Sequence, residues 1–157
     1  MLHRAGIFDA EVLAALHAVC FPEDPWDDAA FRHLLAGPGM FAIIAGVAGD
    51  PPEPAGFMVA RAIAGEAEIV TFGVLPAFRG NGLGATLLAE MLDVAEAQGA
   101  EAAFLEVAED NLAAHRLYTA HGFAEIGRRP NYYRRNGHAV AALVMKRQII
   151  PSGAVHS

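Results

Sequence analysis

The chain reads Val74-Leu75-Pro76-Ala77-Phe78-Arg79-Gly80-Asn81-Gly82-Leu83-Gly84 near its middle, and this stretch is the most informative one about the fold. An apolar, strand-like run ends at Val74, three glycines follow, and a helical pattern begins at Leu83. Bare backbone N–H groups at a helix N-terminus bind anions, because the orphan donors and the positive end of the helix dipole point the same way. The stretch therefore predicts a strand, a turn and a helix, and two interpretations of the turn stay open: it binds a diphosphate-bearing ligand, or it is an ordinary glycine-rich turn before a helix. Arg79 can add a charge-assisted contact.

The patterns on either side of this turn predict an α+β, or mixed α/β, domain with one central sheet. Asp9 and Asp27 are placed to cap two helices near the N-terminus. The first of these helices is expected to bury a face made of Val12, Leu13, Leu16, Val19 and Cys20. Strand patterns cover residues 41–47, 56–63, 67–75, 103–107, 123–127 and 139–145.

Two further helices lie between the strand patterns. The helix that begins at Leu83 is expected to end at Gly99. The next is capped by Asp110 or Asn111, runs through Ala120 and ends at His121-Gly122. The order is two helices, an antiparallel meander, a β-α-β-α step and a closing hairpin. Residues 1–150 are predicted to form a single domain, followed by a frayed tail at 151–157.

The composition excludes several classes of protein. Of 157 residues, 54% are hydrophobic and 18% charged, which excludes intrinsic disorder. Cys20 is the single cysteine, so no intrachain disulfide forms, and the chain suits a reducing cytoplasm. No signal peptide or membrane-spanning run is present, and the seven histidines lack a metal-ligand spacing. We therefore expect a cytoplasmic protein without a metal.

The charge distribution indicates what kind of partner the chain can bind. The net charge of −7 argues against nucleic-acid binding. Residues 1–110 carry 4 Lys/Arg and 17 Asp/Glu, a balance of −13, whereas residues 111–157 carry 7 Lys/Arg and 1 Glu, a balance of +6. Two interpretations stay open: two solvated faces, or an acidic groove for a cationic substrate beside a basic edge for a phosphate-bearing cofactor.

The glycine turn admits a second nucleotide interpretation. Gly80-x-Gly82-x-x-Ala85, with Glu106 about 20 residues further on, is a permitted form of the dinucleotide-binding fingerprint of oxidoreductases. That fingerprint normally follows the first strand of a large parallel sheet, whereas here it follows an antiparallel meander. A Walker A loop is excluded, because no Lys-Ser/Thr pair follows Gly84.

Several short motifs in a fixed order resemble the GNAT superfamily of acetyl-CoA-dependent N-acetyltransferases. They are Arg79-x-x-Gly82-x-Gly84, Leu105-Glu106-Val107, Asn111, Leu117-Tyr118 and Gly122-Phe123. The resemblance implies the GNAT fold, a mostly antiparallel twisted sheet flanked by helices. It also implies that acetyl-CoA is bound along the strand before the turn and by the turn itself. The residues so assigned are Phe72, Gly73, Val74, Arg79, Gly80, Asn81, Gly82, Leu83, Gly84, Ala85, Asn111 and Tyr118.

A closer resemblance covers nearly the whole chain. The chain is similar to the RimI-type branch, whose members acetylate the N-terminal alanine of a small-subunit ribosomal protein. The segments that carry this likeness are His17–Pro22, Pro25-Trp26, Glu66–Ile69, Phe104–Val107 and Arg128–Tyr133. Two features depart from that branch: Arg134-Arg135-Asn136-Gly137 replaces a segment with proline and acidic residues, and no arginine follows Val107.

The resemblance assigns catalytic roles to two residues. Glu106 is expected to take a proton from the acceptor ammonium, directly or through water, because a partly desolvated strand-end carboxylate is a better base. Tyr118 is expected to protonate the leaving sulfur. The bland alternatives are a surface ion pair for Glu106, a core tyrosine for Tyr118 and a plain helix cap for Asn111. Tyr132 and Tyr133 either line a peptide groove or pack on the sheet edge.

The acceptor is predicted to be a protein N-terminus or a small amine, and a basic one. At pH 7 about 10% of α-amines are neutral, against roughly 0.04% of lysines, so a modest base suffices for an α-amine. Three alternatives stay open: a GNAT enzyme acting on lysine or a small amine, a non-catalytic coenzyme-binding module, and an oxidoreductase. The sequence makes no prediction of oligomeric state.

Overall fold

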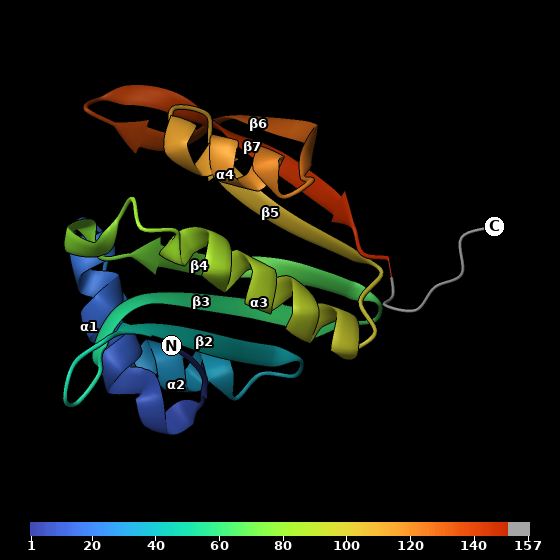
Figure 1. Cartoon of the computed structure of the whole chain (residues 1–157). Coiled ribbons are helices and arrows are strands. Elements are labelled where there is room, and N and C mark those ends of the chain that lie inside the picture. The colour runs from blue at the N-terminus through green and yellow to red at the C-terminus, as the bar shows by residue number, and fades with distance from the viewer. Residues whose placement is uncertain (151–157) are drawn as a thin grey trace.

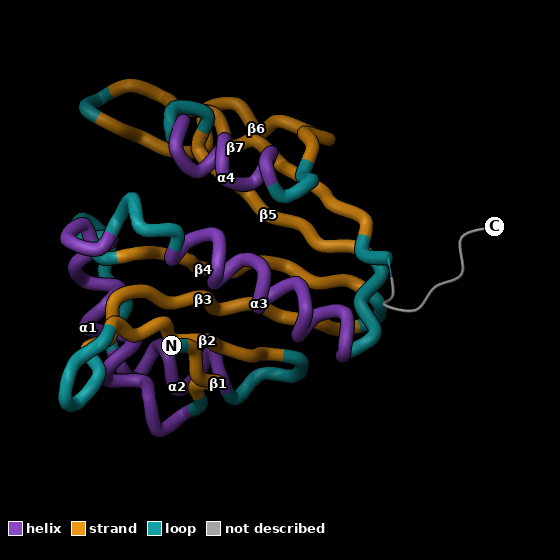
Figure 2. The backbone as a smooth tube through the Cα atoms, in the orientation of Figure 1, coloured by secondary structure: helices purple, strands orange, loops and turns teal. Residues whose placement is uncertain are grey.

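The computed structural model describes residues 1–150, so the tail predicted at 151–157 lies outside the described residues. Seven strands form one sheet in the order β1-β2-β3-β4-β5-β7-β6. Figure 1 labels β2 to β7, and Figure 2 labels β1 beside β2. Their bounds are β1 Leu2–Ala5, β2 Met40–Val47, β3 Glu53–Ile63, β4 Glu66–Val74, β5 Ala102–Ala108, β6 Ala124–Arg135 and β7 His138–Gln148. Every neighbouring pair is antiparallel except β4 and β5. The prediction of a mixed α/β fold with a mostly antiparallel sheet is confirmed.

Helices cover both faces of this sheet. Their bounds are η1 Ile7–Asp9, α1 Ala10–Cys20, α2 Asp28–Leu35, η2 Pro76–Phe78, α3 Leu83–Ala97 and α4 Leu112–Ala120, where η marks a single 3₁₀ turn. Successive residues of a strand point to opposite faces. Ile43 and Met58 accordingly pack in one core with α3 and α4, whereas Ile44 and Phe57 pack in a second core with α1 and α2.

β4 and β5 separate toward one end of the sheet. Parallel pairing joins only Glu66–Glu68 to Ala102–Phe104. Immediately beyond, Val70 has no opposite residue on β3 and forms a β-bulge, a feature that bends a strand. β4 continues to Val74 and β5 to Ala108 without pairing to each other, and Figure 2 shows the two strands diverging. Residues at this end of β4 thus have a free edge toward β5.

The sequence patterns underestimate the sheet at both edges. β1 is not predicted, because four residues are too few to show an alternation. The final hairpin is longer than predicted, since β6 reaches Arg135 and β7 reaches Gln148. Almost all of β6 is exposed, so the apolar-polar alternation that marks a half-buried strand is missing there.

The predicted apolar face of α1 is wrong in part. Val12 and Val19 are exposed, and the buried face is formed by Ala10, Leu13, Leu16 and His17. Because His17 is buried and Val12 and Val19 are not, the buried face of α1 is rotated about the helix axis relative to the face that the apolar residues predict.

The helix ends follow the predictions more closely. Asp27 caps α2 by accepting a hydrogen bond from the Ala30 N–H at 2.8 Å. Asp9 precedes α1, but its carboxylate accepts from the Gly6 N–H instead of capping the helix. Gly99 and Gly122 end α3 and α4 with positive φ angles of 88° and 87°, as predicted.

Candidate active site

The glycine turn leaves a helix N-terminus open. Gly80 and Gly82 have φ angles of 84° and 82°, a region that side chains rarely adopt, and Gly82 is the N-cap of α3. A Cβ atom at either position would meet no atom within 4 Å. The first helical hydrogen bond is donated by the Thr86 N–H to the Gly82 carbonyl at 3.0 Å, so the N–H groups of the three preceding residues have no acceptor within the helix.

Gly84 serves a different purpose from the two glycines before it. A Cβ at Gly84 would lie 3.3 Å from Leu117 of α4 and 3.6 Å from the Phe72 ring of β4. The missing side chain therefore lets the start of α3 pack closely against both elements. This contact places the open helix end directly beside the free edge of β4.

That free edge supplies further backbone groups. Phe72, Gly73 and Val74 pair with β3 on one side and have no strand partner on the β5 side. Backbone N–H and C=O groups need hydrogen-bond partners, so this edge can pair with an extended ligand as a strand would. The three residues predicted to bind the coenzyme arm thus lie at the opening between β4 and β5.

Arg79 lies against the end of β4. Its Nε donates a hydrogen bond to the Val74 carbonyl at 2.9 Å. Burial raises the pKa of the neighbouring Cys20 thiol, and the Arg79 guanidinium opposes that effect. Cys20 also packs on Gly73, where an added Cβ would come within 2.9 Å of its sulfur. Arg79 therefore braces the turn, and its predicted contact with a diphosphate stays a prediction.

Tyr118 lies on α4 with its ring in the core. Its ring centroid is 6.2 Å from that of Phe72 on β4 and 5.8 Å from that of Phe123. Burial strongly raises the pKa of Tyr118, and the nearby Tyr133 raises it further. The hydroxyl group is therefore held in its protonated form, the state that a proton donor requires.

Glu106 reaches the same region from the other side of the sheet. Its neighbours Leu105 and Val107 pack in the core beneath α3 and α4, so the Glu106 side chain points to the opposite face. The carboxylate forms a 3.1 Å ion pair with Arg129 of β6 and is partly exposed. Its surroundings are thus an ion pair rather than the desolvated environment that the sequence suggests.

Tyr133 links the two predicted catalytic groups. Burial raises the pKa of its phenol, followed in size by the effects of Glu106 and Tyr132, while Arg135 opposes the rise. The same phenol acts on Tyr118. Tyr133 therefore lies within electrostatic range of both Glu106 and Tyr118. The sequence alone left the place of Tyr133 undecided.

Asn111 caps α4, and its Oδ1 accepts from the Ala114 N–H at 3.2 Å. The plain-cap interpretation is therefore present in the structure, and the predicted coenzyme contact of Asn111 stays a prediction.

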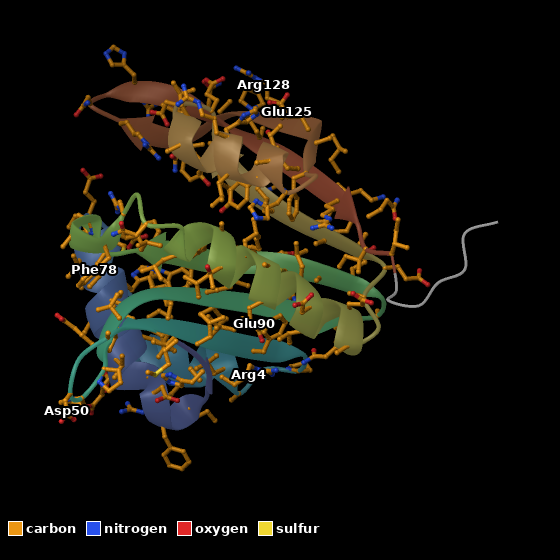
Figure 3. All side chains as sticks on the ribbon, viewed as in Figure 1. Arg4, Asp50, Phe78, Glu90, Glu125 and Arg128 are labelled. Atoms are coloured by element: carbon orange, nitrogen blue, oxygen red, sulfur yellow. The ribbon has the colours of Figure 1, made fainter. Side chains whose placement is uncertain are left out.

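The basic C-terminal region largely neutralises acids at the end of β5. Three arginines of β6 form these ion pairs: Arg128 with Glu109 at 2.8 Å, Arg129 with Glu106 at 3.1 Å and Arg135 with Asp110 at 3.2 Å. Figure 3 labels Arg128 on this side of the β4–β5 opening and Phe78, beside the glycine turn, on the other. These three arginines therefore do not form the basic edge for a phosphate-bearing cofactor that the charge distribution suggested.

Two surface pockets lie away from the glycine turn. One, of about 510 Å³, lies between α4 and β6 and contains the His115–Glu125 and Arg128–Glu109 pairs. The other, of about 410 Å³, lies over α1 and the α1–α2 loop beside Trp26. Within residues 1–150 no helix is long and apolar enough to cross a membrane.

The topology decides between the two nucleotide interpretations. A dinucleotide-binding fold needs several parallel strands, and the described residues contain one parallel pair, β4 and β5. The oxidoreductase alternative is therefore wrong.

Comparison with known proteins identifies a family. Residues 10–123 match the Acetyltransferase (GNAT) family. The chain is 40% identical over 131 residues to the N-alpha-acetyltransferase RimI of Mycobacterium tuberculosis, covering 82% of this chain and 81% of that protein. It is 36% identical over 91 residues to the [ribosomal protein bS18]-alanine N-acetyltransferase of Salmonella typhimurium, covering 57% and 62% of the two chains.

Solved structures share the fold. The ribosomal-protein-S18-alanine N-acetyltransferase of Escherichia coli superposes with a TM-score of 0.84 at 24% identity, covering 100% of both chains. Arabidopsis thaliana NAA60 in complex with acetyl-CoA superposes with a TM-score of 0.81 at 20% identity, covering 95% of this chain and 98% of the other.

Proposed function

Since the chain belongs to the GNAT family of acetyltransferases, we propose that it transfers the acetyl group of acetyl-CoA to the N-terminal amine of a protein. The favoured acceptor is the N-terminal alanine of a ribosomal protein, which would place the activity in the cytoplasm. The observation that carries this proposal is the opening between β4 and β5, which has an open helix N-terminus beside it. Glu106 and Tyr118 approach it from opposite faces of the sheet.

The residues at this opening fit the parts of acetyl-CoA. The N–H groups of Leu83, Gly84 and Ala85 lack acceptors within α3 and suit a diphosphate. The edge of Phe72–Val74 has no strand partner on the β5 side; Arg79 occupies the Val74 carbonyl, and the other groups on that edge suit an extended amide-containing arm. The coenzyme, when bound, supplies an acetyl carbonyl activated as a thioester.

The catalytic roles follow from the chemistry of each side chain. Glu106 takes the proton of the acceptor ammonium, directly or through a water molecule, and so makes the nitrogen nucleophilic. Tyr118 is protonated at neutral pH and gives its hydroxyl proton to the leaving sulfur; burial raises its pKa and makes it a weaker acid, so the transfer depends on the position of the hydroxyl beside the sulfur. Both groups act in one ternary complex, in which the amine and the thioester are held together.

An α-amine acceptor fits these groups better than a lysine does. Glu106 is partly exposed and forms an ion pair with Arg129. About 10% of α-amines are already neutral at pH 7, against roughly 0.04% of lysines, so a modest base suffices only for the former. The similarity to an N-alpha-acetyltransferase and to alanine N-acetyltransferases supports the same choice.

Mass spectrometry tests the proposal directly. A basic peptide with a free N-terminal alanine and one internal lysine is incubated with the enzyme and acetyl-CoA, and fragmentation locates the added acetyl group. Acetylation of the alanine supports the proposal. Acetylation of the lysine assigns a side-chain acceptor instead, and no acetylation with coenzyme binding retained assigns a small amine or a binding module. Glu106→Gln serves as the control: it lacks the proposed base, so it is expected to acetylate the peptide more slowly.

A further inference from the structure

Arg129 occupies the carboxylate that the proposed reaction needs. Its Nη2 lies 3.1 Å from Oε1 of Glu106, and the Arg129 side chain retains 57% of its exposure. An acceptor arrives mainly as an ammonium ion, since about 90% of α-amines are protonated at pH 7. Two cations then compete for one carboxylate.

The sheet brings these two residues together across β7. Arg129 of β6 lies opposite Ala142, and Ala142 lies opposite Ala108 of β5, two residues beyond Glu106. Residues two apart on a strand share a face, so Arg129 and Glu106 lie on the same side of the sheet. α4, which carries Tyr118, covers the other face.

Arg129 also has a second partner. Its guanidinium lies over the Tyr132 ring, 5.6 Å from the centroid, and Tyr132 is exposed. A guanidinium can stack on an aromatic face after leaving a carboxylate. The side chain can therefore release Glu106 without losing every partner.

We infer that Arg129 is a positioning residue that holds the Glu106 carboxylate between turnovers and is displaced by the ammonium group of the acceptor. This inference rests on the proposed function, because it needs Glu106 to be at the acceptor site. It predicts that the removal of the guanidinium strengthens acceptor binding, whereas the loss of a merely structural ion pair would weaken binding or leave it unchanged.

The neighbouring Arg128 offers a matched control. It forms a 2.8 Å ion pair with Glu109, and the exposures of the two pairs are nearly equal, 59% and 35% against 57% and 30%. As the next residue on the strand, Arg128 faces the other side of the sheet. Arg128→Gln and Arg129→Gln thus remove the same charge from adjacent positions.

The experiment measures binding without turnover. Calorimetry on the enzyme saturated with coenzyme A, which carries no acetyl group, compares a peptide that has a free N-terminal alanine with its N-acetylated form. Exposed ion pairs of this kind correspond to a change of about threefold in affinity. Arg129→Gln is expected to bind the free-amine peptide about threefold more tightly and the acetylated peptide unchanged. Arg129→Lys and Arg128→Gln should stay near wild type. In steady-state kinetics KM for the peptide should fall while kcat stays within twofold.

Each other outcome overturns the inference. Unchanged or weaker binding of the free-amine peptide by Arg129→Gln, or an equal gain by Arg128→Gln, shows that Arg129 does not compete with the ammonium. The failure of the proposed function looks different: wild-type enzyme would then show no preference for the free-amine peptide, and both conclusions would fall together.

Discussion

Gly82→Ala tests the role of the glycine turn most sharply. Gly82 has a φ of 82°, and an alanine held there costs about 1–2 kcal/mol of stability. A Cβ at Gly82 would meet no protein atom within 4 Å, so it would project into open space at the N-terminus of α3. Alanine at this position therefore strains the turn and adds a methyl group at the proposed diphosphate site.

The expected loss of affinity can be worked from one hydrogen bond. A backbone N–H bonded to a charged group contributes about 1.5–3 kcal/mol. If the Cβ, or a relaxed φ, moves the diphosphate away from one such group, coenzyme A binds about 10- to 100-fold more weakly. Isothermal titration calorimetry with coenzyme A measures this loss. The strain should also lower Tm by about 3–6 °C.

Gly65→Ala separates the two effects. Gly65 lies between β3 and β4, has a φ of 81°, and likewise has open space at its Cβ. It precedes Glu66, at the end of β4 farthest from the glycine turn. Gly65→Ala should therefore lose the same Tm and keep wild-type coenzyme affinity. If Gly82→Ala binds coenzyme A within twofold of wild type, or if Gly65→Ala loses as much affinity, the turn is not the diphosphate site.

Two further predictions concern single side chains. Tyr118→Phe removes the hydroxyl and keeps the packed ring, so kcat should fall about 100-fold or more while coenzyme A affinity stays unchanged; a kcat within threefold of wild type, measured by thiol release, would remove Tyr118 from the acid role. His17 is buried, and its Nδ1 accepts a hydrogen bond from the backbone N–H of Trp26. Desolvation lowers the pKa of His17, and the charge of Asp24 opposes this effect. The unfolded chain therefore binds this proton more readily. The stability contributed by neutral His17 is present above about pH 6.5 and is lost as the pH falls through the lowered folded pKa. Urea denaturation between pH 7.5 and 5 should show this loss in wild type and a smaller one in His17→Gln, and equal pH dependence in both would refute it.

The parts of the fold that could be predicted are encoded over short stretches of chain. The turn at Gly80–Gly84 is one, because positive φ angles and the helical spacing from Leu83 are local properties. The cap at Asp27 is another, since capping joins residues three apart. β6 could not be predicted to its full length, because its residues are exposed and polar and its pairing with β7 alone defines it.

The contacts of the candidate site depend instead on strand register. Arg129 meets Glu106 only because β6 and β5 both pair with β7, and the β6–β7 ladder shifts register between Arg129 and Tyr133. Tyr133 follows this shift, and there Glu106 raises the pKa of Tyr133 while Tyr133 raises that of Tyr118. No spacing rule within the sequence specifies a register across three strands, so neither the ion pair nor the place of Tyr133 could be predicted.

The two proposed catalytic groups illustrate why a bulge matters to chemistry. Strand alternation places Glu106 on one face of the sheet, and Tyr118 comes from the helix layer on the other. In a continuous sheet the backbone would separate them. The bulge at Val70 bends β4 just beyond its last pair with β5, and the strands then diverge where Glu106 and Tyr118 lie. A substrate placed in that opening can meet a base from one face and an acid from the other. In the proposed mechanism, the divergence of two neighbouring strands therefore lets groups from opposite faces act on one reaction.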